Sequence, residues 1–160
     1  MIEVQIDSIR VSLISDSRLM VLKEIGVERF LSIWIGQFEV EAIAIHLRSV
    51  EIKRPMTHDL LKNVVEELKG AVQKVVVSEL RDNTFYALVY VETAGDLLAI
   101  DARPSDAIAL ALRARAPILV EEAVIDSAKS IDFSSEKADS ERLQKWLESL
   151  DPEELGKYKM

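Results

Sequence analysis

The first part of the chain alternates apolar and polar positions in the manner of β-strands. Residues 2–6 show this alternation, and residues 9–13 continue it in the opposite phase. A change of phase within one strand moves the apolar side chains to the other face, so the step at Asp7–Ser8 predicts either a β-bulge or a strand that passes between two packing environments. Apolar runs over residues 19–22 and 30–35 predict two further strands.

Three later stretches have the apolar spacing of helices. They cover residues 39–47, the residues from Thr57 to Gly70, and residues 104–115. In the second stretch Thr57 suits the N-cap and Gly70 the stop. Its apolar residues form one stripe with charged residues on the other side, which predicts that the stripe packs on the core. The stripe consists of Leu60, Leu61, Val64, Val65 and Leu68.

Apolar runs over residues 72–80, 84–93 and 97–101 predict three more strands. The turns between them are short, which favours an antiparallel meander. Residues 117–121 predict a last short strand. The expected fold class is therefore α+β, with a mostly antiparallel sheet and helices packed on it in a single compact domain.

The composition of the chain changes after residue 126, where the fraction of charged residues rises. We expect residues 1–130 to form the domain and residues 131–160 to form an acidic linker and an amphipathic C-terminal helix. Apolar residues at i, i+3, i+4 and i+7 from Leu143 predict that helix. The sequence leaves open whether it packs on its own domain or binds a partner.

The overall composition, with 49% hydrophobic and 30% charged residues, is typical of a soluble globular protein. The absence of cysteine excludes disulfides and thiolate metal sites. A net charge of −8 argues against a tight electrostatic DNA binder, although metals bound by carboxylates would reverse the local field. No secretion signal or membrane-spanning run is recognisable, so we expect a cytoplasmic protein without a membrane partner.

Polar residues gather where the third helix begins. Asp101, Arg103, Ser105 and Asp106 surround Pro104, which fixes φ in the first helical turn. Side chains at such a position are held on ordered backbone, as a functional site requires. Two interpretations stay open: the residues form a site, or they cap the helix, with Asp106 complementing the positive end of its dipole.

A second polar cluster lies at the start of the second helix and contains Arg54, Thr57, His58 and Asp59. Free backbone amides at a helix N-terminus attract anions such as phosphate, and an arginine can bind phosphate through two hydrogen bonds. Histidine titrates near neutrality, so His58 suits a metal ligand or a general acid–base. The alternative is that Thr57 caps the helix, Asp59 complements its dipole and His58 is simply exposed.

Several familiar catalytic motifs are missing from the sequence. No G-x-S-x-G element supports a triad of Ser105, His58 and Asp101. No phosphate-binding loop, dinucleotide fingerprint, calcium loop or H-E-x-x-H pattern occurs. Tyr86 and Tyr90 share one face of a predicted strand, where they suit base stacking or packing in a core or dimer.

Over about residues 1–130 the chain resembles the bifunctional nuclease domain family. The motifs that carry the resemblance are Arg54-Pro55-Met56-Thr57-His58-Asp59-Leu60-Leu61, Val75-Val76-Val77, Phe85-Tyr86-Ala87 and Ile100-Asp101-Ala102-Arg103-Pro104-Ser105-Asp106-Ala107 with the helix that follows. The most specific is Asp-Ala-Arg-Pro-Ser-Asp-Ala. The resemblance implies a compact α+β domain that tends to form homodimers and cleaves both DNA and RNA.

The resulting expectation is a metal-assisted nuclease that hydrolyses DNA and RNA with little sequence preference. Asp101 and Asp106, together with His58, would hold Mg²⁺ or Mn²⁺ and serve as the catalytic residues. The residues expected to bind and orient the phosphate are Arg54, Thr57, Arg103 and Ser105. The alternative is a non-catalytic, dimeric regulatory domain that binds an anion or a partner protein. The nuclease mechanism requires the two helix starts to converge.

Overall fold

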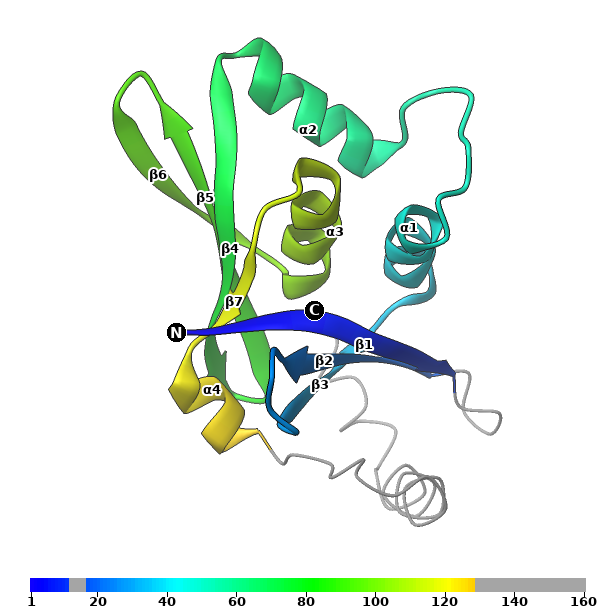
Figure 1. Cartoon of the computed structure of the whole chain (residues 1–160), viewed down its shortest axis with the longest axis vertical. Coiled ribbons are helices and arrows are strands. Elements are labelled where there is room, and N and C mark those ends of the chain that lie inside the picture. Colours follow the sequence, from blue (N-terminus) through cyan, green and yellow to red (C-terminus); the bar gives the residue numbers. More distant parts are fainter. Residues whose placement is uncertain (12–16, 129–160) are drawn as a thin grey trace.

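The computed structural model describes residues 1–11 and 17–128. These residues form one seven-stranded sheet and four helices, which confirms the α+β class (Figure 1). In chain order the elements are β1 (Ile2–Val11), β2 (Arg18–Glu24), β3 (Phe30–Ile35), α1 (Gln37–Leu47), α2 (Thr57–Glu67), β4 (Gly70–Arg81), β5 (Thr84–Thr93), β6 (Asp96–Ala102), α3 (Pro104–Ala114), β7 (Ile118–Val120) and α4 (Glu122–Ser127).

The sheet consists of two antiparallel meanders joined through a short central strand. Its strand order is β3-β2-β1-β7-β4-β5-β6. The central strand β7 is antiparallel to β1 and parallel to β4. Because α3 connects β6, at the edge of the sheet, to β7 in its centre, the helix is carried back across β4 and β5. The register of β1 on β2 shifts between Ile6 and Ser8, which confirms the predicted bulge.

Most element boundaries agree with the sequence predictions. Strands β3 and β5 match to the residue, and α1 begins slightly earlier than predicted, at Gln37. The short helix α4 is not predicted, because six residues are too few to show a helical period. The predicted helix from Leu143 lies outside the described residues.

Within residues 1–11 and 17–128, no helix is long and apolar enough to cross a membrane.

Helix α3 is the centre of the core. In Figure 1 it lies between α1 and the strands β4–β6, with α2 across one end. Ala107, Ile108 and Ala111 are buried in one cluster with Val75 of β4 and Val89 of β5. The small alanine side chains let the helix backbone approach the sheet closely, so the polar residues of α3 are carried on a rigid element.

The apolar stripe of α2 does not pack on the core as predicted. Leu60, Leu61, Val64 and Leu68 are exposed, while Val65 is partly buried against the core. The reason is the direction of the helix, which crosses one end of the sheet instead of lying along its face (Figure 1). Only a narrow part of its circumference therefore meets the interior.

The ends of α2 also differ from the prediction. The N-cap is Met56 and Thr57 is the first helical residue. The Met56 N–H donates to Oδ2 of Asp59 at 2.9 Å, so the side chain of the third helical residue satisfies the backbone amide of the N-cap. At the other end Lys69, with φ of 66°, makes the left-handed turn, and Gly70 begins β4.

Candidate functional site

Two helix starts that are far apart in the sequence meet on one side of the sheet. The residues before α2 and α3, Met56 and Arg103, are both extended, so each chain turns sharply into its helix there. Nε2 of His58, in the first turn of α2, lies 2.9 Å from Oδ1 of Asp106, in the first turn of α3. The convergence that a shared site requires is therefore present.

Asp106 accepts hydrogen bonds on both carboxylate oxygens, from Nε2 of His58 and from Nε of Arg103 at 2.8 Å. The bond from His58 is the largest cause that lowers the pKa of Asp106 from 3.8 to about 2; partial burial opposes it and Arg103 adds to it. An ionised carboxylate can only accept, so Nε2 of His58 carries the proton. In the neutral ring Nδ1 then has the lone pair.

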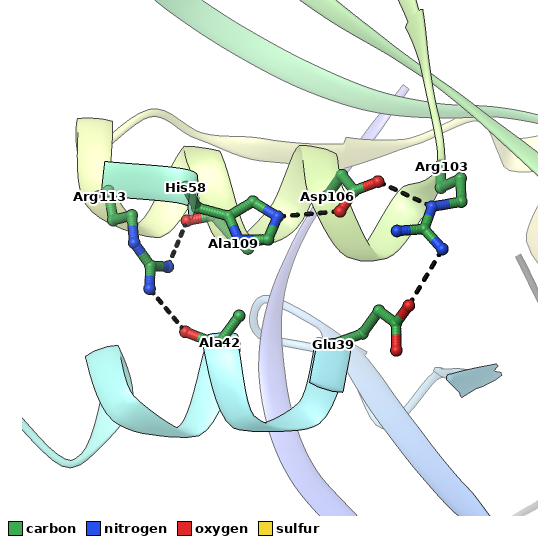
Figure 2. A network of polar contacts seen from close by, with 7 residues as sticks. All are labelled: Glu39, Ala42, His58, Arg103, Asp106, Ala109 and Arg113. Carbon is green, nitrogen blue, oxygen red and sulfur yellow. Dashed lines mark hydrogen bonds and ion pairs between the residues drawn. The ribbon is translucent and has the colours of Figure 1, made fainter. Parts of the chain in front are cut away.

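Arg103 links α3 to α1. Its Nη1 donates to Oε1 of Glu39 at 3.0 Å, while its Nε is bonded to Asp106 (Figure 2). The hydrogen bond to Asp106 is the largest cause that raises the pKa of Arg103 above its usual value; partial burial opposes it and Glu39 adds to it. The side chain is 45% exposed. Its Nη2 has no partner among residues 1–11 and 17–128 and is able to donate to a bound anion.

These side chains line a cavity of about 300 Å³ between α1, α2 and α3. His58, Asp106, Arg103 and Glu39 form much of its polar wall, and Thr57 lies beside them. The side chains of the wall differ in exposure: the imidazole of His58 is 13% exposed, whereas the guanidinium of Arg103 is open to solvent. Its volume is at the lower end of the range for small-ligand sites.

A buried arginine in the wall of this cavity joins the three helices. The side chain of Arg113, in the last turn of α3, is 4% exposed. Its Nε donates to Oδ1 of Asp59 at 2.9 Å, its Nη1 to the Ala109 carbonyl at 2.9 Å and its Nη2 to the Ala42 carbonyl at 2.8 Å. Figure 2 shows Arg113 reaching from α3 to the Ala42 carbonyl of α1. Each of its nitrogens is thus engaged within the protein.

Asp101 is not brought into the cavity. In the sheet Asp101 pairs with Leu88 of β5. The next residue of β5, Val89, points into the core, where α3 packs. Successive side chains of a strand point to opposite faces, so the Asp101 side chain lies on the face away from α3. It is exposed, and it does not line the cavity with Asp106.

The four residues expected to bind and orient phosphate divide into two pairs. Arg103 and Thr57 line the cavity. Arg54 is exposed and lies outside the cavity lining. Ser105 is 1% exposed, so its hydroxyl is not accessible to a substrate.

In the described part of the chain, Asp101 and Asp106, the carboxylates expected to hold Mg²⁺ or Mn²⁺, do not converge on one point. Such a site needs several oxygen ligands directed at one point, whereas Asp101 and Asp106 lie on opposite faces of the sheet. Both oxygens of Asp106 already accept hydrogen bonds. No group of three or more His, Asp or Glu side chains within the described part of the chain is arranged to hold a metal ion. The preformed chemistry of the cavity is that of an imidazole–carboxylate pair beside a cation.

Sequence reasoning does not single out Glu39 or Arg113. Glu39 has the position of an ordinary acidic residue in the first turn of a helix. Arg113 ends an apolar run, and its burial depends on Asp59 from another helix. One signal was available: Arg113 follows Asp106 by seven residues (106 to 113), so both project from the same face of α3.

Comparison with known proteins gives a consistent result. The sequence matches the family described as "Bifunctional nuclease domain" over residues 20–132. An uncharacterized protein of Mycobacterium tuberculosis is 36% identical over 162 residues, which cover 96% of this chain and 97% of that protein.

Two plant proteins match more distantly. Bifunctional nuclease 1 of Oryza sativa subsp. indica is 30% identical over 105 residues, 63% of this chain and 32% of that protein. Bifunctional nuclease 2 of Arabidopsis thaliana is 28% identical over 121 residues, 72% of this chain and 37% of that protein. The match therefore spans about a third of each plant protein.

Proposed function

The chain belongs to the bifunctional nuclease domain family, and from this premise we propose that it hydrolyses phosphodiester bonds of DNA and RNA at the cavity between α1, α2 and α3. The observation that carries the proposal is the 2.9 Å contact between His58 and Asp106 beside the partly exposed Arg103. The names of the plant relatives supply the class of reaction. The cavity supplies groups suited to it.

In this mechanism His58 is the general base. Asp106 fixes the tautomer and orientation of the ring, so that Nδ1 takes a proton from the attacking water as its oxygen bonds to phosphorus. The bond from phosphorus to the leaving oxygen then breaks, and His58 returns the proton to that oxygen. Arg103 donates to the phosphate oxygens on which negative charge accumulates.

The shape and charge of the cavity favour substrates without a defined sequence. Phe38 lines the cavity and is largely exposed, so a base can stack on its ring whatever the base is. Water as the nucleophile requires no 2′-hydroxyl, which makes DNA and RNA equivalent in the chemical step. Arg103 faces the carboxylates of Glu39 and Asp106, so we expect weak, salt-sensitive binding of the nucleic-acid backbone.

The test is hydrolysis of labelled single- and double-stranded DNA and RNA by the full chain. His58→Ala is expected to lower kcat about 100-fold or more, the scale of a general base, and Asp106→Asn about 10-fold or more. The matched control is His46→Ala, which removes an exposed histidine of α1 outside the cavity lining. Full activity in His58→Ala, or an equal loss in His46→Ala, would contradict the proposal.

Dependence on Mg²⁺ or Mn²⁺ stays a prediction, and it is examined in the same assay with either ion or a chelator. Asp101→Asn distinguishes the two possible roles of the carboxylates. Since Asp101 lies outside the cavity, we expect this variant to retain activity while Asp106→Asn loses it. Equal losses in the two variants would favour a shared metal site instead of the imidazole–carboxylate pair.

The proposal includes a homodimer formed through the edge strand β6. No strand of the described sheet pairs with its outer side, and Leu97, Leu98 and Ile100 are exposed along it. An open apolar edge is a template for a further strand. Antiparallel pairing of β6 with β6 of a second copy is self-complementary and closes after two subunits.

A further inference from the structure

We infer that the pair formed by the buried Arg113 and the partly buried Asp59 is a positioning device that holds His58 against Asp106. Neither residue is given a chemical role in the mechanism above. The kinetic part of this inference rests on the proposed function, whereas the structural part rests on the contacts alone.

Asp59 fixes the turn of backbone that carries His58. One oxygen of its carboxylate accepts from the Met56 N–H at 2.9 Å, and the other accepts from Nε of Arg113 at 2.9 Å. Asp59 is the residue after His58. Its carboxylate is bonded both to the backbone of Met56, two residues before the histidine, and to Arg113 of α3. The first turn of α2 is therefore attached to α3 directly beside the imidazole.

Arg113 is itself held from three directions. It donates to the Ala109 carbonyl of its own helix, to the Ala42 carbonyl of α1 and to Asp59 of α2. A guanidinium can serve three such directions because its donors form a planar fork, which the ammonium of lysine lacks. Among the described residues Asp59 is the carboxylate that pairs with this buried charge. Loss of either partner leaves the other charge or its hydrogen bonds unmatched.

The two contacts between α2 and α3 together define an orientation as well as a distance. His58 and Asp59 are adjacent on α2, while their partners, Asp106 and Arg113, are seven residues (106 to 113) apart on one face of α3. At 1.5 Å per residue the partners are about 10 Å apart along that helix. Two anchors at this separation prevent α2 from pivoting about the His58–Asp106 contact, so the orientation of the His58 ring in the cavity wall is fixed.

The experiment follows the His58 ring by ¹⁵N NMR in Asp59→Asn and Arg113→Lys. The chain has two histidines, so the spectra of His58→Ala and His46→Ala assign both rings. We expect each variant to move the His58 ring signals and weaken its Nε2–H tautomer. We also expect kcat to fall about 10-fold or more with KM changed less than about 2-fold, because small misplacements of a catalytic group act on the chemical step.

The matched control is Glu24→Gln, which breaks a partly buried ion pair with Arg29 outside the cavity lining. It is expected to leave the His58 signals and kcat unchanged. Folded Asp59→Asn and Arg113→Lys proteins with unaltered His58 signals would overturn the inference. If Asp59→Asn does not fold, Asp59→Glu replaces it in the test, because this variant keeps the charge but displaces it by one methylene. An unaltered His58 signal in folded Asp59→Glu also overturns the inference.

The NMR measurement separates this inference from the proposed function, because it needs no turnover. If His58→Ala leaves hydrolysis intact while Asp59→Asn moves the His58 signals, the proposed function fails and the positioning role stands. If His58→Ala abolishes hydrolysis while Asp59→Asn leaves both the signals and kcat unchanged, the proposed function stands and the positioning role fails.

Discussion

At the scale of single residues, the cavity depends on carboxylates that each accept two hydrogen bonds. Asp106 accepts from His58 and Arg103, and Asp59 accepts from Arg113 and a backbone N–H. Hydrogen bonds to a charged acceptor are stronger than those between neutral groups. A carboxylate occupied in this way is held in one orientation, and it fixes the side chains that donate to it.

The lowered pKa of Asp106 predicts a dependence of stability on pH. Hydrogen bonds in the folded state lower the pKa from 3.8 to about 2, so the ionised carboxylate favours folding. This contribution is complete above about pH 4 and is lost as the pH falls through about 2. Asp106→Asn should therefore reduce the free energy of unfolding by about 1.5–3 kcal/mol near neutral pH, the scale of a hydrogen bond to a charged group.

Urea unfolding over a series of pH values measures this effect. The difference between the wild type and Asp106→Asn should shrink toward zero near pH 2. Asp101→Asn is the control, since the exposed side chain of Asp101 has no ion pair among the described residues, and its effect should be small at every pH. A difference for Asp106→Asn that stays constant down to about pH 2 would contradict the assigned hydrogen bonds.

At the scale of elements, α3 both packs in the core and carries residues of the cavity, and different positions of its sequence serve these two functions. Its buried alanines and Ile108 face the sheet, and its cavity face carries Asp106 and Arg113. Because the core side is packed tightly, the cavity side is held at a fixed distance from α1 and α2. Packing of the helix and geometry of the site are therefore coupled.

Ile108→Ala measures how strongly the fold depends on this helix. Ile108 is fully buried in the core, so the variant should lose about 2–5 kcal/mol of unfolding free energy, the usual cost of a large-to-small core substitution. Thermal or denaturant unfolding gives the value. Leu47→Ala, at the exposed end of α1, is the control and should cost less than about 1 kcal/mol. A loss in Ile108→Ala no greater than in the control would mean that α3 is not central to the core.

At the scale of the whole molecule, exposed apolar residues occur on both β6 and α2. An added Cβ at Gly70 would lie 3.1 Å from both Val65 of α2 and Val91 of β5, so these two side chains are neighbours. Val91 pairs with Leu98 of the edge strand. Val65 of α2 and Leu98 of β6 thus lie on the same face of the sheet. Exposed apolar residues that gather on one face mark interaction sites.

Leu98→Lys is the test of the proposed homodimer. A charge at the centre of the edge should raise the dissociation constant of the dimer by about 10-fold or more, equivalent to about 1.4 kcal/mol, measured by sedimentation equilibrium. Val50→Lys replaces an exposed apolar residue outside β6 and α2 and should leave the dissociation constant unchanged. A wild-type chain that is monomeric at high concentration would contradict the proposal, as would equal effects of the two substitutions.

The sequence alone determined the strands, the three longer helices and their order. Strand and helix periods differ, so the pattern of apolar residues defines β3, β5 and α3 closely, and the phase change in β1 locates its bulge. Pro104 and the polar residues around it mark the start of α3. These features are local, since each depends on the conformation of a few neighbouring residues.

The tertiary structure decided which side chains meet. Contact between His58 and Asp106 spans 48 residues, and its formation depends on how α2 crosses the sheet. That same crossing exposes the apolar stripe of α2, which local periodicity assigned to the core. The pleat of β6 places Asp101 away from the cavity, although it is close to Asp106 in sequence. A periodic pattern identifies the faces of an element, but the packing of all elements determines what each face contacts.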